Sequence, residues 1–274
     1  MSDLASRHDV LLLDLDGVVY VGDAPVPWAV EAVASAVAQG LGLAYVTNNA
    51  SRTPAQVAAH LRSLGVPAAD EQVITSSMAG AALLAERVPG SRVLAVGGEG
   101  VAWALHERGL QPVESLDERT AGIMQGYGPE VCWRDLAELV YAVRSGLPWV
   151  ATNLDPTLPT PRGPAPGNGS LVDLVAGVAG RRPDFVAGKP EPALLREAIH
   201  RTGAQRPLVV GDRLDTDIAA GARLRLPTLL VLTGISSEAD AMSAAPASQP
   251  SYVADDLRCL MPGGAWRTLP AQAR

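Results

Sequence analysis

Residues 9–20 read DVLLLDLDGVVY, an apolar run that ends in two carboxylates and a glycine. A short, unbroken apolar run of this kind predicts a strand buried on both faces, as in a parallel sheet. Residues two apart in a strand project to the same side, so Asp14 and Asp16 should both point beyond the carboxyl end of the strand. Open α/β sheets bind their ligands at that end, which makes this pair the first candidate site.

The carboxylate pair has more than one interpretation when the residues are taken alone. Two acids held together raise each other's pKa unless a cation lies between them, so the pair indicates either a metal site or a shared proton. The alternative is a strand that runs into an Asp-Gly turn, with Asp16 only supporting the turn. The DxDG pattern by itself favours the turn, and the motifs further along the chain reverse that preference.

The composition excludes several classes of protein. A chain of 274 residues, 47% of them hydrophobic, is long enough for two domains or one large one. Its net charge of −7 argues against a nucleic-acid partner, because a phosphate-backbone surface needs clustered Lys and Arg. No apolar run reaches the ~20 residues that cross a bilayer. The N-terminus carries acids where a signal peptide has basic residues. We therefore expect a cytoplasmic protein that does not bind membranes.

Lysine usage singles out one residue. Of the 22 basic residues, only Lys189 is a lysine, and all the others are Arg. An ammonium is compact, whereas a guanidinium is larger and planar, so the two are not interchangeable in a tight site. Lys189 is therefore a functional candidate before any motif is considered.

The rest of the chain alternates short apolar strands with helices, which predicts βαβ units, a parallel sheet and right-handed crossovers. A second unit is expected to begin near residue 90 and to end at a linker over 180–183. After this linker the strand at 184–187 should resume the core pattern. The segments 154–169 and 239–250 are predicted loops. We expect further strands at 41–46, 73–74, 92–96, 121–125, 149–152, 207–210, 226–232 and 252–253, and helices at 29–39, 54–64, 78–87, 99–108, 133–144, 170–178 and 192–201.

Polar side chains follow four of the predicted strands and should meet at one edge of one sheet. Each group alone is typical of turn chemistry. Together they supply carboxylates, a hydroxyl, amides and an ammonium, which are the parts needed to transfer a phosphoryl group. The groups are Asp14 with Asp16, Thr47 with Asn48, Lys189, and Asp212 with Asp217.

These stretches resemble the four motifs of the haloacid dehalogenase superfamily of phosphohydrolases. The motifs read DLDGVV, VTNN, GKP and GDRLDTD, in that order. The insert between the second and third resembles the large C2-type cap of subfamily IIA, which includes p-nitrophenyl phosphatases. The stretch NLDPTLPTPRGPAPGNGS looks closest to the glycerol 3-phosphate phosphatase branch. The resemblance implies a Rossmann-like α/β core over 1–80 and 184–274, with an inserted α/β cap domain over 81–183.

The resemblance also implies a Mg²⁺-dependent phosphatase that acts on a small phosphorylated metabolite. Asp14 would be the nucleophile that forms an aspartyl-phosphate. Asp16 would be the general acid and base, a residue that dehalogenases of the superfamily lack. Mg²⁺ would be held by Asp14, the backbone carbonyl of Asp16 and Asp212, with Asp217 orienting its waters. Lys189 would pair with the nucleophile and the phosphoryl group.

Further residues would bind the substrate. Thr47, Asn48 and Asn49 would donate to phosphoryl oxygens, and Gly17 would let the backbone approach them. Candidate contacts from the cap are Asn153, Asp155, Arg162 and Asn168.

Two residues near these motifs have alternative roles, and a third is assigned to a helix cap. Asn168 could instead only cap the helix predicted to begin at Ser170. Asp217 could be a helix-dipole acid in the first turn of its helix. Asp215 is the predicted N-cap of that same helix.

Two departures from the family pattern concern Val18, where many members have Thr, and Gly128, where relatives often have Asp after the Tyr of the cap. The first position contributes mainly backbone, whereas the second weakens the transfer of substrate contacts through this loop.

Other signals are discounted. The run Gly97–Gly100 resembles part of a dinucleotide fingerprint but lacks its spacing, so a plain strand-to-helix turn is expected. The four histidines have no ligand-like spacing, so solvated or capping roles are expected for His8, His60, His106 and His200.

Several functions stay open at this point. Phosphoglycolate, pyridoxal phosphate or a nucleoside monophosphate are alternative substrates to glycerol 3-phosphate. Transfer of the phosphoryl group to a second alcohol is an alternative outcome of the same intermediate. A non-catalytic metabolite-binding protein on this fold is a further alternative. A homodimer is possible, although the sequence identifies no patch for it.

Overall fold

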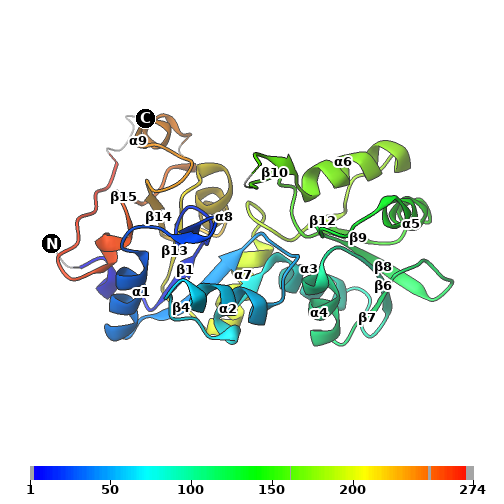
Figure 1. The fold of residues 1–274 in the computed structure, drawn as a ribbon, viewed down its shortest axis with the longest axis horizontal. Coiled ribbons are helices and arrows are strands. Elements are labelled where there is room, and N and C mark those ends of the chain that lie inside the picture. Colours follow the sequence, from blue (N-terminus) through cyan, green and yellow to red (C-terminus); the bar gives the residue numbers. More distant parts are fainter. Residues whose placement is uncertain (1–2, 161, 246–247, 270–274) are drawn as a thin grey trace. The chain divides into compact units, whose positions relative to one another are not determined.

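The structure is a computed structural model that describes residues 3–160, 162–245 and 248–269 (Figure 1). It divides into two compact units. The first comprises Met1–Val46, Val57–Val73 and Lys189–Arg274, and the second comprises Thr47–Gln56 and Ile74–Gly188. The core and cap bounds implied by the resemblance stay a prediction.

A six-stranded sheet forms the centre of the first unit. Its strand β1 (Val10–Leu13) is buried along its whole length and pairs in parallel with β13 and β4, as the apolar run predicts. The strand order is β15 (Tyr252–Ala254), β14 (Thr228–Val231), β13 (Pro207–Gly211), β1, β4 (Gly42–Thr47) and β5 (Val73–Thr75). The ends of β1, β4 and β13 therefore carry the first, second and fourth motifs.

The helices close to this sheet are α1 (Ala29–Ala38), α2 (Pro54–Ser63), α7 (Ala193–Thr202), α8 (Ala219–Arg223) and α9 (Glu238–Ser243). Helix α2 begins at Pro54, as its capping sequence predicts, because Gln56 Oε1 accepts from Thr53 N at 2.9 Å. Helix α9 lies in a predicted loop. It forms because Ser237 and Asp240 cap its N-terminus reciprocally.

A five-stranded parallel sheet forms the centre of the second unit. Its order is β12 (Phe185–Val186), β9 (Trp149–Ala151), β8 (Thr120–Gln125), β6 (Arg92–Val96) and β7 (Gln111–Val113). Helices α5 and α6 pack against each other on one side of this sheet, and α3 and α4 pack together on the other (Figure 1). These helices are α3 (Ser76–Ala85), α4 (Glu99–Glu107), α5 (Trp133–Arg144) and α6 (Asn168–Ala179). The glycine run before α4 is a strand-to-helix turn, as predicted.

One strand lies in a different sheet from the one predicted. The strand at 184–187 was expected to resume the core, but β12 pairs in parallel with β9 of the second unit. Asp184 fixes this pairing, since its Oδ2 accepts from Trp149 N at 2.8 Å and its N donates to Trp149 O at 2.9 Å. The guanidinium of Arg87 also lies 3.8 Å from the centre of the Phe185 ring. Lys189 therefore does not follow a strand of the six-stranded sheet.

The remaining predicted helices and strands are found with ends within two residues of expectation. The sequence did not indicate two hairpins, β2 (Tyr20–Val21) with β3 (Ala24–Pro25) and β10 (Thr157–Leu158) with β11 (Ala165–Pro166). His8 is buried, contrary to expectation, with Nδ1 at 3.3 Å from Arg206 O and the ring edge-on to Tyr252. Within the described ranges, no helix combines the length and apolarity needed to cross a bilayer.

Candidate active site

Lys189 joins two carboxylates inside the first unit. Asp14 directly follows β1, and its backbone N–H donates to Val210 O at 2.9 Å. The Nζ of Lys189 donates to Asp14 Oδ1 at 2.7 Å and to Asp217 Oδ1 at 2.6 Å. It also donates to Val46 O at 3.3 Å, and the lysine is only 4% exposed. The one lysine of the chain is thus a buried cation between two acids.

Two further acids come from the fourth motif. Asp212 directly follows β13, and Asp217 lies in a π-helical turn, Leu214–Ile218. Asp212 Oδ2 accepts from Ile235 N at 2.8 Å, and Asp217 Oδ2 accepts from Arg213 N at 3.2 Å. Carboxylate oxygens of Asp14, Asp212 and Asp217 lie within 4.8 Å of one another. We call these three residues the acidic cluster.

The pKa values of Asp14 and Asp212 reflect burial and repulsion by the neighbouring Asp217. Burial, together with the nearby charge of Asp217, raises the pKa of Asp14 to about 8, although Lys189 opposes this shift. Burial and Asp217 likewise raise the pKa of Asp212 to about 6. Burial disfavours the charged form of Lys189, but Asp14 and Asp217 outweigh it and raise its pKa above the usual value. One ammonium therefore does not balance the three acids of the cluster, of which Asp212 and Asp217 are buried.

This imbalance fits a divalent cation. Asp212 Oδ1 is buried and has no hydrogen-bond partner within the described part of the chain. A buried carboxylate oxygen without a partner is costly unless it binds a cation or water. Hard oxygen ligands are those that Mg²⁺ prefers. The residues present therefore suit Mg²⁺.

Gly17 and Asp16 lie in the turn after β1. Gly17 has φ +78°, and a Cβ there would lie 2.5 Å from Asp212 Oδ2, so only glycine fits. Its carbonyl accepts from Thr233 Oγ1 at 2.6 Å. Asp16 is exposed, and its side chain lies outside the acidic cluster. The strand ends at Leu13, so the two-residue alternation does not extend to Asp16. Its acid/base role stays a prediction.

The predicted phosphate-binding residues of the second motif lie in the second unit. Thr47 is buried, and its Oγ1 accepts from Asn49 N at 3.0 Å. Asn49 is exposed, and its Oδ1 accepts from Ser51 N at 2.9 Å. Asn48 Nδ2 donates to Asp155 Oδ2 at 3.1 Å, and Asn48 O accepts from Asn153 Nδ2 at 2.8 Å. The structure thus brings Asn48 together with two of the predicted cap contacts.

The other two cap candidates differ in their contacts, since in the described part of the chain only Asn168 hydrogen-bonds to a residue of that group. Arg162 is exposed in the loop between β10 and β11, and its N donates to Thr160 Oγ1 at 3.2 Å. Asn168 is 1% exposed and donates to Asn153 O at 2.8 Å.

Two predicted helix caps are wrong. Helix α6 begins at Asn168 itself, with Gly167 as its N-cap residue and no side-chain capping bond. The amide of Asn168 donates instead to backbone carbonyls of neighbouring segments. Asp215 does not cap the turn at 214–218, because it pairs with Arg213 Nη2 at 2.8 Å.

Sequence reasoning missed Ser76, which donates from Oγ to Asn48 O at 2.6 Å. The signal available was its place directly after a short predicted strand, as for the motif residues.

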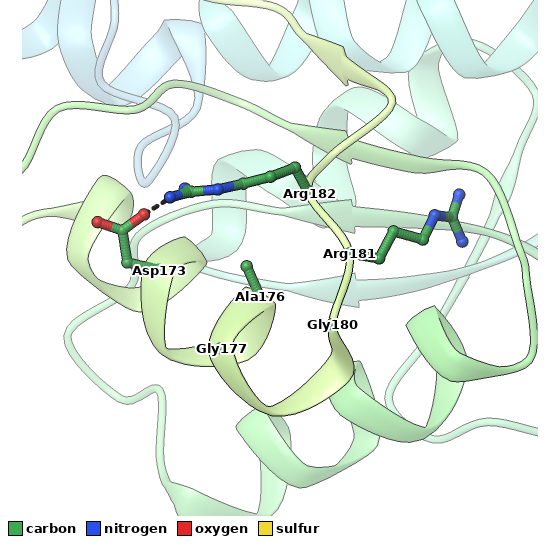
Figure 2. Close-up of a pocket in the computed structure, with 6 residues that line it drawn as sticks. All are labelled: Asp173, Ala176, Gly177, Gly180, Arg181 and Arg182. Atoms are coloured by element: carbon green, nitrogen blue, oxygen red, sulfur yellow. Dashed lines mark hydrogen bonds and ion pairs between the residues drawn. The ribbon is translucent and has the colours of Figure 1, made fainter.

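A separate hollow at the carboxyl end of α6 contains none of the predicted site residues. Figure 2 shows its lining, Asp173, Ala176, Gly177, Gly180, Arg181 and Arg182, in which Asp173 and Arg182 form an ion pair.

Comparisons with known proteins identify the family of this chain. A family model described as haloacid dehalogenase-like hydrolase matches residues 11–111, and a second, HAD-hydrolase-like model matches residues 186–260. The chain belongs to the haloacid dehalogenase-like hydrolases, an enzyme family, which confirms the predicted resemblance and fold class.

Two curated relatives within the family are phosphatases. The D-glycerol 3-phosphate phosphatase of Mycobacterium tuberculosis is 47% identical over 95% of this chain and 73% of the relative. An acid sugar phosphatase of Staphylococcus aureus is 36% identical over 85% of this chain and 90% of the relative.

Solved structures show the same relationship. A glycerol phosphate phosphatase from M. tuberculosis in complex with magnesium superposes with a TM-score of 0.90 at 47% identity, covering 95% of this chain and 78% of that one. A p-nitrophenyl phosphatase from Archaeoglobus fulgidus gives a TM-score of 0.83 at 29% identity, with 92% and 97% covered. The predicted class of enzyme is therefore confirmed.

Proposed function

We propose that this chain hydrolyses glycerol 3-phosphate, through an aspartyl-phosphate formed on Asp14. The observation that carries the proposal is the contact of Lys189 with Asp14 inside the acidic cluster. The substrate is supported by the identity of 47% to a D-glycerol 3-phosphate phosphatase, which extends over 95% of the chain.

The reaction divides into two displacements on phosphorus. A carboxylate oxygen of Asp14 attacks phosphorus, and the bond from phosphorus to the glycerol oxygen breaks. Asp16 protonates the departing alkoxide and then takes a proton from the water that attacks the aspartyl-phosphate. This second attack releases inorganic phosphate and restores Asp14.

Lys189 and the proposed cation site act together on Asp14. Even with Lys189 in place, the pKa of Asp14 is about 8, so without a further positive charge its carboxyl group would be largely protonated at neutral pH, and a protonated oxygen is a poor nucleophile. The ammonium at 2.7 Å favours the ionised form and compensates negative charge as the phosphoryl group arrives. Asp14, Asp212 and the backbone carbonyl of Asp16 would hold Mg²⁺, with Asp217 beside them. The bound cation would supply charge neutralisation at the phosphoryl oxygens.

We assign substrate binding to residues of the first motif, the second motif and the cap. Thr47, Asn48, Asn49 and the backbone at Gly17 bind phosphoryl oxygens in this proposal. Arg162, exposed in the loop between β10 and β11, contacts the alcohol portion. Arg162→Ala should change the order in which the enzyme prefers the esters. An unchanged order would show that Arg162 does not contact the substrate.

Phosphate release in Mg²⁺ from a panel of esters tests the activity. The panel holds glycerol 3-phosphate, phosphoglycolate, pyridoxal phosphate, a nucleoside monophosphate, a sugar phosphate and p-nitrophenyl phosphate. We expect glycerol 3-phosphate to be hydrolysed fastest, and Asp14→Asn to be inactive on all of them. Turnover by Asp14→Asn equal to that of the parent would refute the nucleophile. Added acceptor alcohols distinguish hydrolysis from transfer, since transfer would yield a second phosphate ester.

Location and assembly are also part of the proposal. We expect the enzyme to act in the cytoplasm on a small metabolite, and to exist as a homodimer. Sedimentation of the purified protein tests the assembly, and a monomer at micromolar concentration would contradict it.

A further inference from the structure

Three hydrogen bonds within the second unit fix the orientation of Asn48. Its side-chain Nδ2 donates to Asp155 Oδ2 at 3.1 Å. Its backbone carbonyl accepts from Asn153 Nδ2 at 2.8 Å and from Ser76 Oγ at 2.6 Å. The donors and acceptors come from the turn after β9 and from the first residue of α3. Both the peptide and the amide of Asn48 therefore have fixed directions.

Asp155 decides how the amide of Asn48 is turned. An ionised carboxylate only accepts hydrogen bonds, so it selects the nitrogen side of the amide and rejects the oxygen side. In the opposite orientation the amide oxygen of Asn48 would face the Asp155 carboxylate, and two hydrogen-bond acceptors repel each other. For a group that must donate to a phosphoryl oxygen, the wrong end is an acceptor that repels the substrate. The carboxylate thus selects the orientation in which Asn48 is a donor.

Asp155 is itself held firmly by the start of α6. Its backbone N donates to Asn153 Oδ1 at 3.1 Å, and its carbonyl accepts from Gly169 N at 2.8 Å. A Cβ at residue 169 would lie 2.6 Å from the carbonyl carbon of Leu154, so the close approach requires glycine. The buried Asn168 donates to Asn153 O at 2.8 Å. These bonds make the turn at 153–155 a rigid support.

The glycine run at 97–100 supports the segment that follows Asn48. Gly100 N donates to Ser51 O at 3.1 Å, and a Cβ at Gly100 would lie 2.5 Å from Ala50 O. Gln56 Nε2 donates to Glu99 Oε2 at 2.8 Å. The discounted nucleotide fingerprint therefore has a packing role, and residues 47–56 belong to the same compact unit as the turn at 153–155.

We propose that Asp155 is a positioning residue for phosphoryl binding, which acts by fixing the Asn48 amide as a donor. This inference rests on the proposed function, because it assigns Asn48 to the phosphoryl group. It differs from the expectation that Asp155 is itself a candidate substrate contact. Since every phosphate ester has the same phosphoryl group, the effect of Asp155 is independent of the alcohol.

Steady-state kinetics with glycerol 3-phosphate and p-nitrophenyl phosphate test this role. Asp155→Ala should lower kcat/KM for both esters by the same factor, about 10- to 100-fold, as for other residues that orient a contact group. It should also weaken inhibition by inorganic phosphate. Asp155→Asn, which still offers a carbonyl acceptor, should retain most of the activity. Asp173→Ala removes an exposed acid of the same unit and should match the parent (Figure 2).

A double-mutant cycle separates positioning from general damage. If Asp155 acts through Asn48, the double variant Asn48→Ala/Asp155→Ala should be no less active than Asn48→Ala alone. Thermal unfolding of each variant checks that it is folded. The proposal is overturned if the effects of the two single substitutions multiply in the double variant. It is also overturned if the preference between the two esters changes, or if Asp155→Ala has parental activity.

Inactivity of the parent on every ester would refute the proposed function instead. The affinity of the same variants for inorganic phosphate would then decide the role of Asp155. A weaker affinity in Asp155→Ala supports the positioning role, and an unchanged affinity overturns it.

Discussion

Replacement of Lys189 by Met should damage both stability and activity. The ammonium is 4% exposed and lies 2.7 Å from Asp14 and 2.6 Å from Asp217. Methionine fills a similar volume but leaves two buried carboxylates without their cation. Removal of one partner from a buried ion pair typically costs about 3–5 kcal/mol of unfolding free energy. Loss of the charge that we propose to stabilise the transferring phosphoryl group should lower kcat at least about 100-fold.

The pKa of Asp14 determines how the destabilisation by Lys189→Met changes with pH. The folded-state pKa of Asp14 is about 8, above its usual value near 3.8, so the folded protein binds the extra proton. Stability from this group is complete below pH 4 and decreases as pH rises towards 8. Without Lys189 the pKa of Asp14 should rise further. The destabilisation of Lys189→Met should therefore be larger at pH 8 than at pH 5.

Urea unfolding at both pH values, in EDTA, measures these differences. Lys189→Arg keeps the charge but places a larger planar group between the two acids, so it should recover part of the stability and little activity. Arg196→Met removes an exposed cation of α7 and should leave both unchanged. An unfolding free energy of Lys189→Met within 1 kcal/mol of the parent, or kcat within about threefold, would refute the reasoning, because both lie below the effects expected for a buried ion pair.

Three further predictions concern the first unit. Gly17→Ala should lower the unfolding free energy by about 1–3 kcal/mol and greatly reduce activity, because its φ is +78° and its Cβ would meet Asp212 Oδ2; urea unfolding measures this. Mg²⁺ at 100 times its dissociation constant should increase the unfolding free energy of the parent by about 2.7 kcal/mol. Its unfolding temperature should rise accordingly. Asp212→Asn should lose most of that gain in a thermal scan, and an equal gain would contradict the metal assignment. Burial lowers the pKa of His8, so its stability contribution, present above pH 6.5, should decrease as pH falls below that value. His8→Phe should flatten the loss of stability between pH 7 and 5, and an unchanged slope would show that other groups cause it.

Local patterns predicted the first unit well because its strands are short apolar runs ended by polar residues. The run at 10–13 becomes a strand buried on every residue, and the acids after it and after β13 meet in the acidic cluster. Lys189, the one lysine in the sequence, donates to two of the three acids of this cluster. These predictions succeeded because a buried charge needs a nearby partner, whatever the details of the loops.

The errors arise where a long-range partner outweighs a local preference. The strand at 184–187 pairs with β9 because of bonds between Asp184 and Trp149, which are 35 residues apart. Asp215 prefers the guanidinium of Arg213 to a helix N-terminus. Asn168 donates to distant carbonyls, so it is not available as a cap. The partners of a polar side chain cannot be deduced from its neighbours in sequence when several acceptors compete for it.

The distribution of the motifs between the two compact units separates two functions that can be measured independently. Asp14, Lys189, Asp212 and Asp217 belong to the first unit, whereas Asn48 and its supports belong to the second. In the proposed function, Mg²⁺ binding rests on the first set, and the orientation of the Asn48 amide as a donor to the phosphoryl group rests on the second. Asp155→Ala should therefore keep the full stabilisation by Mg²⁺ while its inhibition by inorganic phosphate weakens. Asp212→Asn should show the opposite pattern, because it should lose the stabilisation by Mg²⁺ in the thermal scan. If Asp155→Ala also lost the stabilisation by Mg²⁺, the two sets of residues would be energetically coupled, and the turn at 153–155 would act on more than Asn48.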